Sequence, residues 1–221
     1  MQGSVAWGDY DNDGDLDILL TGRDNGSSDV AKIYRNEGGV FVDSETADDA
    51  LAGVRESSVA WADYDNDGDL DILLTGYTGA SLTAKVYRND DGVFVDSGSA
   101  DDAFIPIHGG SVAWGDYDND GDLDILFTGW NISGSGVSKV YRNDSGVFVD
   151  SGTALIGVGS SSVAWGDYDS DRDLDILLTG SNQAKVYRNN DCADMGIVKT
   201  VTPIVPELGA AITYTLSFSN T

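Results

Sequence analysis

The chain has few of the residues that support several common kinds of site. Among 221 residues there is one cysteine, Cys192, and one histidine, His108. A single cysteine excludes an intrachain disulfide. No serine, cysteine or second histidine stands in a recognisable triad context, so we expect a protein that is not an enzyme. The longest apolar run is only a few residues, so no membrane-spanning segment is expected.

Basic residues are also scarce, with 12 Lys and Arg against 38 Asp and Glu and a formal net charge of −26. Nucleic acids and anionic membranes are bound by basic patches, so neither is expected as a partner. Something cationic must instead offset the repulsion among the acidic groups. Hydrophobic residues make up 41% of the chain, which is enough for a folded core.

The sequence is built from four copies of one repeat. The tripeptide "VAW" recurs with Trp7, Trp61, Trp114 and Trp165, and a period of roughly 50 residues indicates a repeat architecture. Each copy contains short segments rich in β-branched and aromatic residues, namely "SVAWGDY", "LDILLTG", "AKVYRN" and "GVFVDS". Gly, Asn and Asp clusters bound these segments, and none has a useful helical period, so each copy predicts four strands.

The pattern within a copy predicts a propeller blade. "DILL" is apolar on consecutive residues, as in a strand covered on both faces, and "NEGG", "NDDG" and "NDSG" favour hairpins. We therefore predict an all-β fold of four-stranded antiparallel meanders, arranged as β-propeller blades. A stacked solenoid is the alternative. The expected blades are about 3–44, 58–97, 111–151 and 162–190, and the last is incomplete because "GVFVDS" does not follow Asn190.

In such a meander the 1–2 and 3–4 connections emerge at one edge, and the 2–3 and 4–1 connections at the other. The first set hardly varies among the copies, whereas the second set varies in length. Variable loops on a rigid scaffold usually carry recognition. The sequence therefore places ligand binding on the 2–3 and 4–1 loops.

The 1–2 connections carry the most distinctive motif, "DYDNDGDLD" at residues 9–17. Aspartates stand at loop positions 1, 3, 5, 7 and 9, and a glycine stands at position 6. Oxygen ligands on alternate residues around a sharp Gly turn are typical of calcium loops. An EF-hand would need Glu at position 12, where the copies have Leu20, Leu74, Phe127 and Leu178, so we expect a calcium loop within a β-hairpin. A solvated acidic turn is the plain alternative.

The fourth loop, "DYDSDRDLD", departs from the pattern. Ser170 replaces Asn, and Arg172 replaces the glycine. A non-Gly residue at positive φ costs about 1 kcal/mol, and the arginine adds a cation near the site. We expect this loop to bind calcium most weakly.

The string "SVAWGDYDNDGDLDILLTG…KVYRNDDGVFVDS" resembles the FG-GAP/VCBS repeats of bacterial surface and secreted proteins, the blade type of the integrin α-subunit propeller. The resemblance covers about residues 3–191. It implies a propeller, commonly seven-bladed, with Ca²⁺ in each 1–2 loop, four ions in all. It implies a secreted or cell-surface protein used in adhesion or in binding a protein or glycan. The implied metal ligands are Asp9, Asp11, Asp13, Asp15, Asp17, Asp63, Asp65, Asp67, Asp69, Asp71, Asp116, Asp118, Asp120, Asp122, Asp124, Asp167, Asp169, Asp171, Asp173 and Asp175.

The count of blades departs from the family. Three full blades and a partial fourth leave three possibilities: an open fragment, a homodimer that completes the propeller, or further blades upstream. The first residues have no signal-peptide pattern and run almost directly into a repeat, so we expect the sequence to be a fragment of a longer protein.

Residues 192–221 change character, with no aspartate loop and with Pro203 and Pro206. "IVKTVTP" and "ITYTLSFSN" alternate like strands. They resemble the opening of an immunoglobulin-like repeat of bacterial surface proteins. We expect a truncated start of such a domain, or a tail that supplies the missing strand of the fourth blade.

The remaining residues fit structural roles. We expect the "VAW" tryptophans to pack between blades, and the lysine and arginine on each third strand to pair with nearby aspartates. Tyr77 and Trp130 open variable loops and could contact a ligand, although blade packing is the more common role of such residues. A carbohydrate-binding lectin is therefore the alternative function. A propeller-type hydrolase is third, because no acid/base pair stands outside the aspartate loops.

Overall fold

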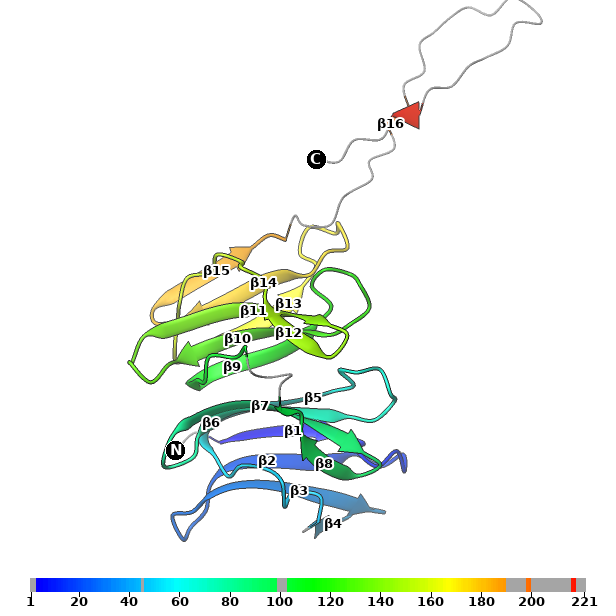
Figure 1. Cartoon of the computed structure of the whole chain (residues 1–221), viewed down its shortest axis with the longest axis vertical. Helices are drawn as coiled ribbons and strands as arrows, with labels where there is room; N and C mark the ends of the chain where they lie inside the picture. Colours follow the sequence, from blue (N-terminus) through cyan, green and yellow to red (C-terminus); the bar gives the residue numbers. More distant parts are fainter. Residues whose placement is uncertain (1–2, 45, 99–102, 190–197, 200–215, 218–221) are drawn as a thin grey trace, which may run out of the picture. The chain divides into compact units, whose positions relative to one another are not determined.

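A computed structural model describes residues 3–44, 46–98, 103–189, 198–199 and 216–217 (Figure 1). The chain divides into two compact units, Met1–Asn189 and Asn190–Thr221. Of the second unit, the described residues are the strands β16 (Val198–Lys199) and β17 (Leu216–Ser217), which pair antiparallel. The rest of the expected immunoglobulin-like segment, with Cys192, lies outside the described residues.

The first unit is all-β, and its described residues contain no α-helix. Three four-stranded antiparallel meanders and one three-stranded meander follow one another along the chain, each a separate sheet in sequential strand order. They are blade 1 with β1 (Ser4–Gly8), β2 (Asp17–Arg23), β3 (Asp29–Glu37) and β4 (Val40–Asp43); blade 2 with β5 (Arg55–Ala62), β6 (Asp71–Tyr77), β7 (Leu82–Asp90) and β8 (Val93–Asp96); blade 3 with β9 (His108–Gly115), β10 (Asp124–Trp130), β11 (Gly136–Asp144) and β12 (Val147–Asp150); and blade 4 with β13 (Ser162–Gly166), β14 (Asp175–Gly180) and β15 (Gln183–Tyr187).

These separate sheets confirm the predicted fold class of β-propeller blades. A solenoid would give ladders that continue from one repeat to the next, whereas here no named strand of one meander pairs with a named strand of another. The first strands β1, β5, β9 and β13 lie beside one another in turn, so successive blades pack face to face. The fourth blade lacks its outer strand among the described residues, as the sequence predicted.

The apolar run "DILL" behaves as predicted where a blade has neighbours on both sides. In β6 and β10 every residue up to the glycine is buried, because each strand lies in the middle of its sheet and between two blades. In β2 buried and half-buried residues alternate instead. In β14 Leu177 is exposed although its counterparts are buried. Blades 1 and 4 are thus covered on only one side within the described residues.

Three apolar clusters fill the spaces between blades, one at each junction. Trp61, Trp114 and Trp165 pack against these clusters, which confirms the expected role of the "VAW" tryptophan. The prediction is wrong for Trp7, which is 60% exposed. Its ring faces the side of blade 1 on which the described residues place no other blade.

The 4–1 connections contribute to the same clusters. Val54, Ile107 and Val158 each form a β-bridge to the third strand of the blade they leave, and all three are fully buried. Each connection therefore runs back along its own blade before the next blade begins. Glycine is required where backbones meet, since a Cβ on Gly110 would lie 1.7 Å from the Thr128 carbonyl oxygen.

The basic residues of the third strands pair as expected in blades 1 to 3, whereas in blade 4 Lys185 lies 5.9 Å from the centroid of the Tyr187 ring. Lys32, Lys85 and Lys139 contact the aspartate that ends the outer strand of the same blade, respectively Asp43, Asp96 and Asp150. Arg35, Arg88 and Arg142 contact the acidic residue two positions further on, namely Glu37, Asp90 and Asp144. These pairs are largely exposed, so each adds little to stability.

Candidate metal centres

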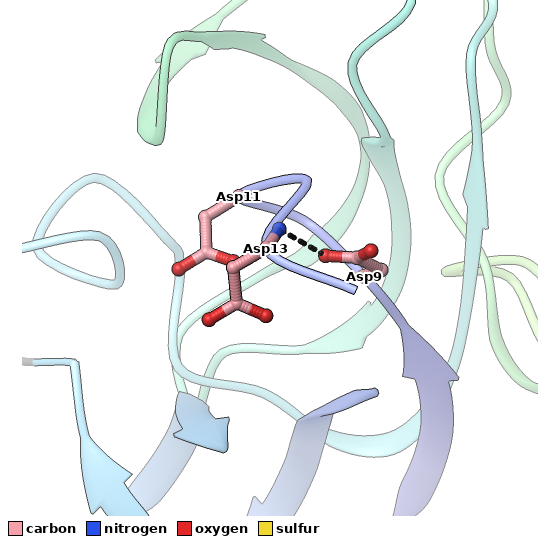
Figure 2. Close-up of side chains that lie close together, drawn as sticks. All are labelled: Asp9, Asp11 and Asp13. Carbon is pink, nitrogen blue, oxygen red and sulfur yellow. Dashed lines mark hydrogen bonds between the residues drawn. The ribbon is translucent and has the colours of Figure 1, made fainter. Parts of the chain in front are cut away.

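Each 1–2 loop is organised around its first aspartate. In blade 1, Asp9 Oδ1 accepts a hydrogen bond from the Asp13 backbone N–H (3.1 Å), and Asp9 Oδ2 accepts one from the Gly14 N–H (3.0 Å). Figure 2 shows Asp9, Asp11 and Asp13 gathered around this turn. Asp63, Asp116 and Asp167 make the same pair of bonds in their own loops. The carboxylate at position 1 therefore closes the loop and fixes its shape.

Positions 5 and 6 complete the turn. The carboxylate of Asp13 accepts a hydrogen bond from the Asp15 N–H at 2.9 Å, and Asp67 and Asp120 do the same in blades 2 and 3. The glycine at position 6 has a φ of 93° in Gly14, with similar values in Gly68 and Gly121. This left-handed backbone is why glycine recurs there.

The aspartate at position 9 is the most deeply buried member of each loop. Asp71 is fully buried; its Oδ1 accepts from the Asn89 N–H (2.8 Å) and its Oδ2 from the Tyr64 N–H (3.0 Å). Asp17, Asp124 and Asp175 make the equivalent two bonds. This aspartate therefore ties the loop to the third strand, a role that the motif alone did not reveal.

The structure brings three carboxylates of each loop within 4.8 Å of one another, as a metal site requires. In blade 1 they occupy positions 1, 3 and 5, and in the other blades positions 1, 3 and 9. The four groups are Asp9, Asp11 and Asp13; Asp63, Asp65 and Asp71; Asp116, Asp118 and Asp124; and Asp167, Asp169 and Asp175. Of the remaining predicted ligands, Asp17, Asp67, Asp120 and Asp171 belong to the same loops but not to these groups.

The carboxylate at position 3 shows that these groups suit a cation. Asp11 Oδ1 and Asp65 Oδ1 are buried and accept no hydrogen bond from the described residues. Burial raises the pKa of both carboxyls, and the neighbouring Asp13 and Asp67 raise it further. A buried carboxylate oxygen without a donor is costly, and a hard divalent cation removes that cost by accepting oxygen ligands.

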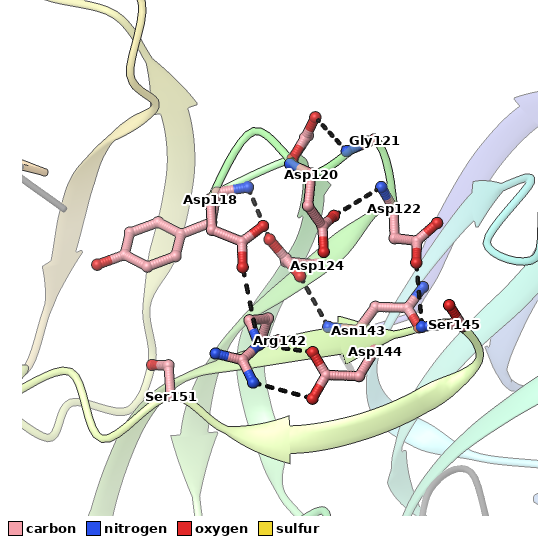
Figure 3. A network of polar contacts seen from close by, with 12 residues as sticks. Asp118, Asp120, Gly121, Asp122, Asp124, Arg142, Asn143, Asp144, Ser145 and Ser151 are labelled. Atoms are coloured by element: carbon pink, nitrogen blue, oxygen red, sulfur yellow. Dashed lines mark hydrogen bonds and ion pairs between the residues drawn. The ribbon is translucent and has the colours of Figure 1, made fainter. Parts of the chain in front are cut away.

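The aspartate side chain at position 7 makes hydrogen bonds to neighbouring loops and hairpins. Asp69 Oδ1 accepts a hydrogen bond from Asn12 Nδ2 of the preceding blade at 2.8 Å, and Asp122 and Asp173 accept in the same way from Asn66 and Asn119. The other oxygen of Asp122 accepts from the Ser145 N–H, as Figure 3 shows. Asp15 accepts from Gly38 in the same hairpin position. These side chains connect neighbouring loops and hairpins and lie outside the three-carboxylate groups.

The fourth loop differs in two ways. Arg172 has a φ of 77°, so a side chain occupies the left-handed position that glycine takes elsewhere. Arg188 contacts Asp169 Oδ2 at 2.6 Å and Asp171 Oδ2 at 2.9 Å. Its counterparts Arg35 and Arg142 pair closely with the 3–4 hairpin and reach the position-3 aspartate of their loops only at 4.0 and 3.7 Å. The positive charge of Arg188 already sits on two loop carboxylates, which adds to the reasons to expect weak metal binding here.

Replacing Arg172 with glycine is expected to strengthen the fourth site. The change removes strain of about 1 kcal/mol and a nearby positive charge. Calcium titration by calorimetry should show the weakest binding step of the Arg172→Gly variant move toward the other three. The matched control, Gly68→Arg, should create a second weak step; equal affinities in all variants would contradict the ranking.

The buried aspartates at position 9 predict a pH dependence for the metal-free protein. Burial raises the pKa of Asp71 to about 7 and that of Asp124 to about 6. Because these pKa values lie above those of the unfolded chain, stability present at low pH is lost as pH rises through them. In chelator, the free energy of unfolding should fall from pH 5 to pH 8. With saturating calcium this fall should disappear between pH 5 and pH 8, because the cation favours the ionised form of the folded protein; the same slope in both conditions would contradict this.

The opposite edge of the blades carries the variable loops and a shallow hollow of about 280 Å³. Arg55 lies over the Tyr77 ring, 4.4 Å from its centroid, and His108 Nδ1 lies 2.8 Å from Glu56 Oε2. Asn131 and the exposed Ile132 complete the rim. This hollow joins blades 2 and 3.

The two aromatic residues that open variable loops have different surroundings. Tyr77 lines the hollow and donates through its hydroxyl to the Gly79 carbonyl oxygen at 2.9 Å. Trp130 packs directly against Gly159 and donates from Nε1 to Ser160 Oγ at 3.4 Å. Trp130 is thus mainly a packing residue, while Tyr77 remains available to a bound molecule along one edge of the hollow.

A model of one known protein family matches the part of the chain that holds the first two aspartate loops. Residues 9–74 match the model of the FG-GAP-like repeat. The matched region begins at the first aspartate loop and ends in β6 beyond the second, so it supports the FG-GAP part of the resemblance. The VCBS and immunoglobulin-like parts stay predictions. No curated protein matches the chain.

Among solved structures, the chain is similar to one titled as the structural basis of specific recognition of non-reducing terminal N-acetylglucosamine by an Agrocybe aegerita lectin. The TM-score is 0.55 and the identity 21%, over 86% of this chain and 50% of that one. The chain thus spans about half the length of the lectin. At this identity the similarity concerns the fold. No helix among the described residues is long and apolar enough to cross a membrane.

Proposed function

We propose that the chain is a calcium-stabilised, extracellular β-propeller module that binds a ligand in adhesion or recognition. The observation that carries the proposal is the fourfold recurrence of one loop geometry, with three carboxylates within 4.8 Å in every blade. A solvated acidic turn does not require the same internal hydrogen bonds or a buried oxygen without a donor. The FG-GAP-like match over two of the loops supports calcium as the ion, and the repeat type supports secretion or surface display.

Calcium would be held at loop positions 1 and 3, joined by position 5 or position 9. It would supply two positive charges per loop in a chain with a net charge of −26. The remaining polar groups prepare the loop: position 1 closes it, and position 9 anchors it to the third strand. Calcium's role in this proposal is structural, since binding to the folded state alone adds stability by linkage.

Ligand recognition is proposed for the variable-loop edge, at the hollow between blades 2 and 3. The hollow offers an aromatic edge at Tyr77, the amide of Asn131, and the charged groups of Arg55 and Glu56. A few polar groups beside apolar surface is the usual composition of a binding site. We propose a binding role rather than catalysis, because the one histidine already contacts Glu56 and no nucleophile lines the hollow.

A lectin is the second candidate, and the same hollow favours it. Sugars stack on aromatic rings and take hydrogen bonds from amides and charged groups, all of which are present here. The structural neighbour recognises terminal N-acetylglucosamine, which makes aminosugars the first probes to use.

Arrays of glycans and of extracellular proteins, probed with the calcium-saturated full chain, test both candidates. Binding should fall at least tenfold in Tyr77→Ala and Asn131→Ala and stay unchanged in Val147→Ala, an exposed residue on an outer strand. Hits confined to glycans would establish the lectin. The absence of any hit that the loop variants weaken would contradict recognition at this edge.

A further inference from the structure

Both ends of the stack of blades expose the side chains that elsewhere form contacts between blades. On blade 1, Val5 is 67% and Trp7 60% exposed, whereas Val59 and Val112, the counterparts of Val5, are buried. On blade 4, Tyr168 is 61%, Leu177 49% and Val186 55% exposed. The counterparts of these three residues are buried in every other blade: Tyr10, Tyr64 and Tyr117; Leu19, Leu73 and Leu126; Ile33, Val86 and Val140.

At each internal junction a tyrosine of one blade meets the tryptophan of the next. Ring centroids lie 6.3 Å apart for Tyr10–Trp61 and for Tyr64–Trp114, and 5.7 Å apart for Tyr117–Trp165. At the first and third junctions the tryptophan also covers the glycine that ends the first strand of the preceding blade, while blade 2 has Ala62 in that place.

Among the described residues, the equivalent glycine of blade 4 has no tryptophan packed against it. A Cβ on Gly8 would lie 2.8 Å from Trp61, and one on Gly115 would lie 2.7 Å from Trp165. At Gly166, the equivalent in blade 4, a Cβ would meet nothing within 4 Å. Gly166 and Tyr168 thus leave space for a tryptophan ring to pack against them. Trp7 is the exposed tryptophan at the other end of the stack.

An asparagine side chain also makes a hydrogen bond across each internal junction, and at the two ends of the stack the donor and the acceptor of this bond lie on different blades without each other. Asn89 Nδ2 donates to the Tyr10 carbonyl oxygen (2.8 Å) across the first junction. Asn143 and Asn189 donate likewise to Tyr64 (2.9 Å) and Tyr117 (2.7 Å).

In blade 1, the equivalent Asn36 donates to Leu16 within its own blade at 3.1 Å. An amide has two N–H donors, so Asn36 can also serve an acceptor from another blade. The matching acceptor is the Tyr168 carbonyl oxygen of blade 4.

The end of blade 1 is also hollowed. A depression of about 520 Å³ is lined by Val5, Leu20, Val30 and Tyr34, among others. In blade 2 the counterparts Val59, Leu74 and Tyr87 share a buried cluster with Leu19 and Ile33 of blade 1. The depression therefore lies where a leucine and a β-branched residue of a preceding blade would pack.

We propose that two copies of this chain associate head to tail, with blade 4 of one copy against blade 1 of the other. Trp7 stacks on Tyr168 of the second copy, Leu177 and Val186 of the second copy fill the depression, and Asn36 donates to the Tyr168 carbonyl oxygen. The second copy is the occupant because each end of the chain carries the half of the junction that the other end lacks. This inference concerns assembly and is independent of the ligand proposed above.

The contact is heterologous, so it must either close or propagate. Two copies would supply eight blades, within the range of known propellers. One bond of the internal junctions is missing, because Ser170 stands where Asn12, Asn66 and Asn119 donate to the next loop. The junction between copies is accordingly weaker than the internal ones, and it should dissociate on dilution.

Light scattering coupled to size exclusion tests this on the full chain in calcium. The expected mass is about twice 23.3 kDa. Trp7→Glu and Leu177→Glu should each be monomeric, while Val147→Glu, an equally exposed apolar residue on an outer strand, should remain dimeric. An equimolar mixture of the two monomeric variants should recover dimers, since one intact junction can still form between them.

Several results would overturn the proposal. They are a monomer at the highest soluble concentration, a mass that rises beyond that of the dimer with concentration, a dimer that only one of the two variants disrupts, or a mixture that stays monomeric. Unfolding curves of the monomeric variants should match that of the diluted parent, because Trp7 and Leu177 are exposed in the single chain. A lower melting temperature in either variant would also count against the assignment of these residues to the junction.

Discussion

Removing calcium is expected to lower the melting temperature of the chain by about 20–40 °C. A ligand present at 100 times its Kd stabilises the folded state by about 2.7 kcal/mol per site. The chain has four clusters of three aspartate carboxylates, each of which could hold one calcium ion. For a chain of this length, each kcal/mol shifts the melting temperature by about 2–4 °C. Calorimetry with and without chelator measures the difference directly.

The control for this experiment is the return of the cation. Calcium in excess over chelator should restore the original transition, whereas magnesium should restore it only in part, because magnesium requires stricter octahedral geometry than these loops impose. A melting temperature that chelator leaves unchanged would mean that the carboxylates are tolerated without an ion. The loops would then be solvated acidic turns.

The second large effect concerns the junctions between blades. Trp114 stacks against Tyr64 and contacts Phe148 at 6.0 Å between ring centroids, and its Nε1 donates to the Ala60 carbonyl oxygen. Trp114→Ala should destabilise the chain by about 3 kcal/mol, because it leaves a cavity between two blades. Urea unfolding, followed by circular dichroism, gives the value.

Trp7 provides the matched control at the same repeat position. It is exposed in the single chain and its ring contact is with Phe41 of its own blade. At concentrations where the chain is monomeric, Trp7→Ala should change the free energy of unfolding by less than about 0.5 kcal/mol. Equal losses for Trp7 and Trp114 would contradict the assignment of Trp114 to a buried junction.

The sequence predicted the local features of the fold well, because each blade is specified by residues close together in the chain. The hairpin turns, the buried "DILL" strand and the Gly of the aspartate loop all depend on conformational preferences within about ten residues. The loops were recognisable for the same reason, since their internal hydrogen bonds join residues four or five positions apart.

The side-chain roles that the sequence did not reveal depend on hydrogen-bond partners that are far away in the sequence. The aspartate at position 9 also anchors its loop to the third strand, as Asp71 does with Asn89. The aspartate at position 7 accepts from the asparagine of another blade, as Asp69 does with Asn12. A motif of alternating aspartates looks the same whether a carboxylate faces a cation, a strand or a neighbouring blade.

The exposure of Trp7 has a similar cause. Four identical tripeptides predict four equal environments, but burial depends on whether a blade precedes the tryptophan. Arg188 shows the same effect at the other end. With no fourth strand and hairpin beside it among the described residues, its guanidinium lies closest to Asp169 and Asp171 of the loop, while Arg35 and Arg142 lie closest to the hairpin and more distantly contact the loop.

Native mass spectrometry of the chain at increasing calcium concentration counts the bound ions and so shows whether the aspartate loops hold calcium. We predict up to four ions per chain; the ion of the fourth loop should bind last, and it should bind at a lower calcium concentration in Arg172→Gly. Replacing Asp65 with alanine should remove one ion and leave the others. A chain that binds no calcium above the level of an Asp-rich unfolded peptide would show that the loops are not calcium sites.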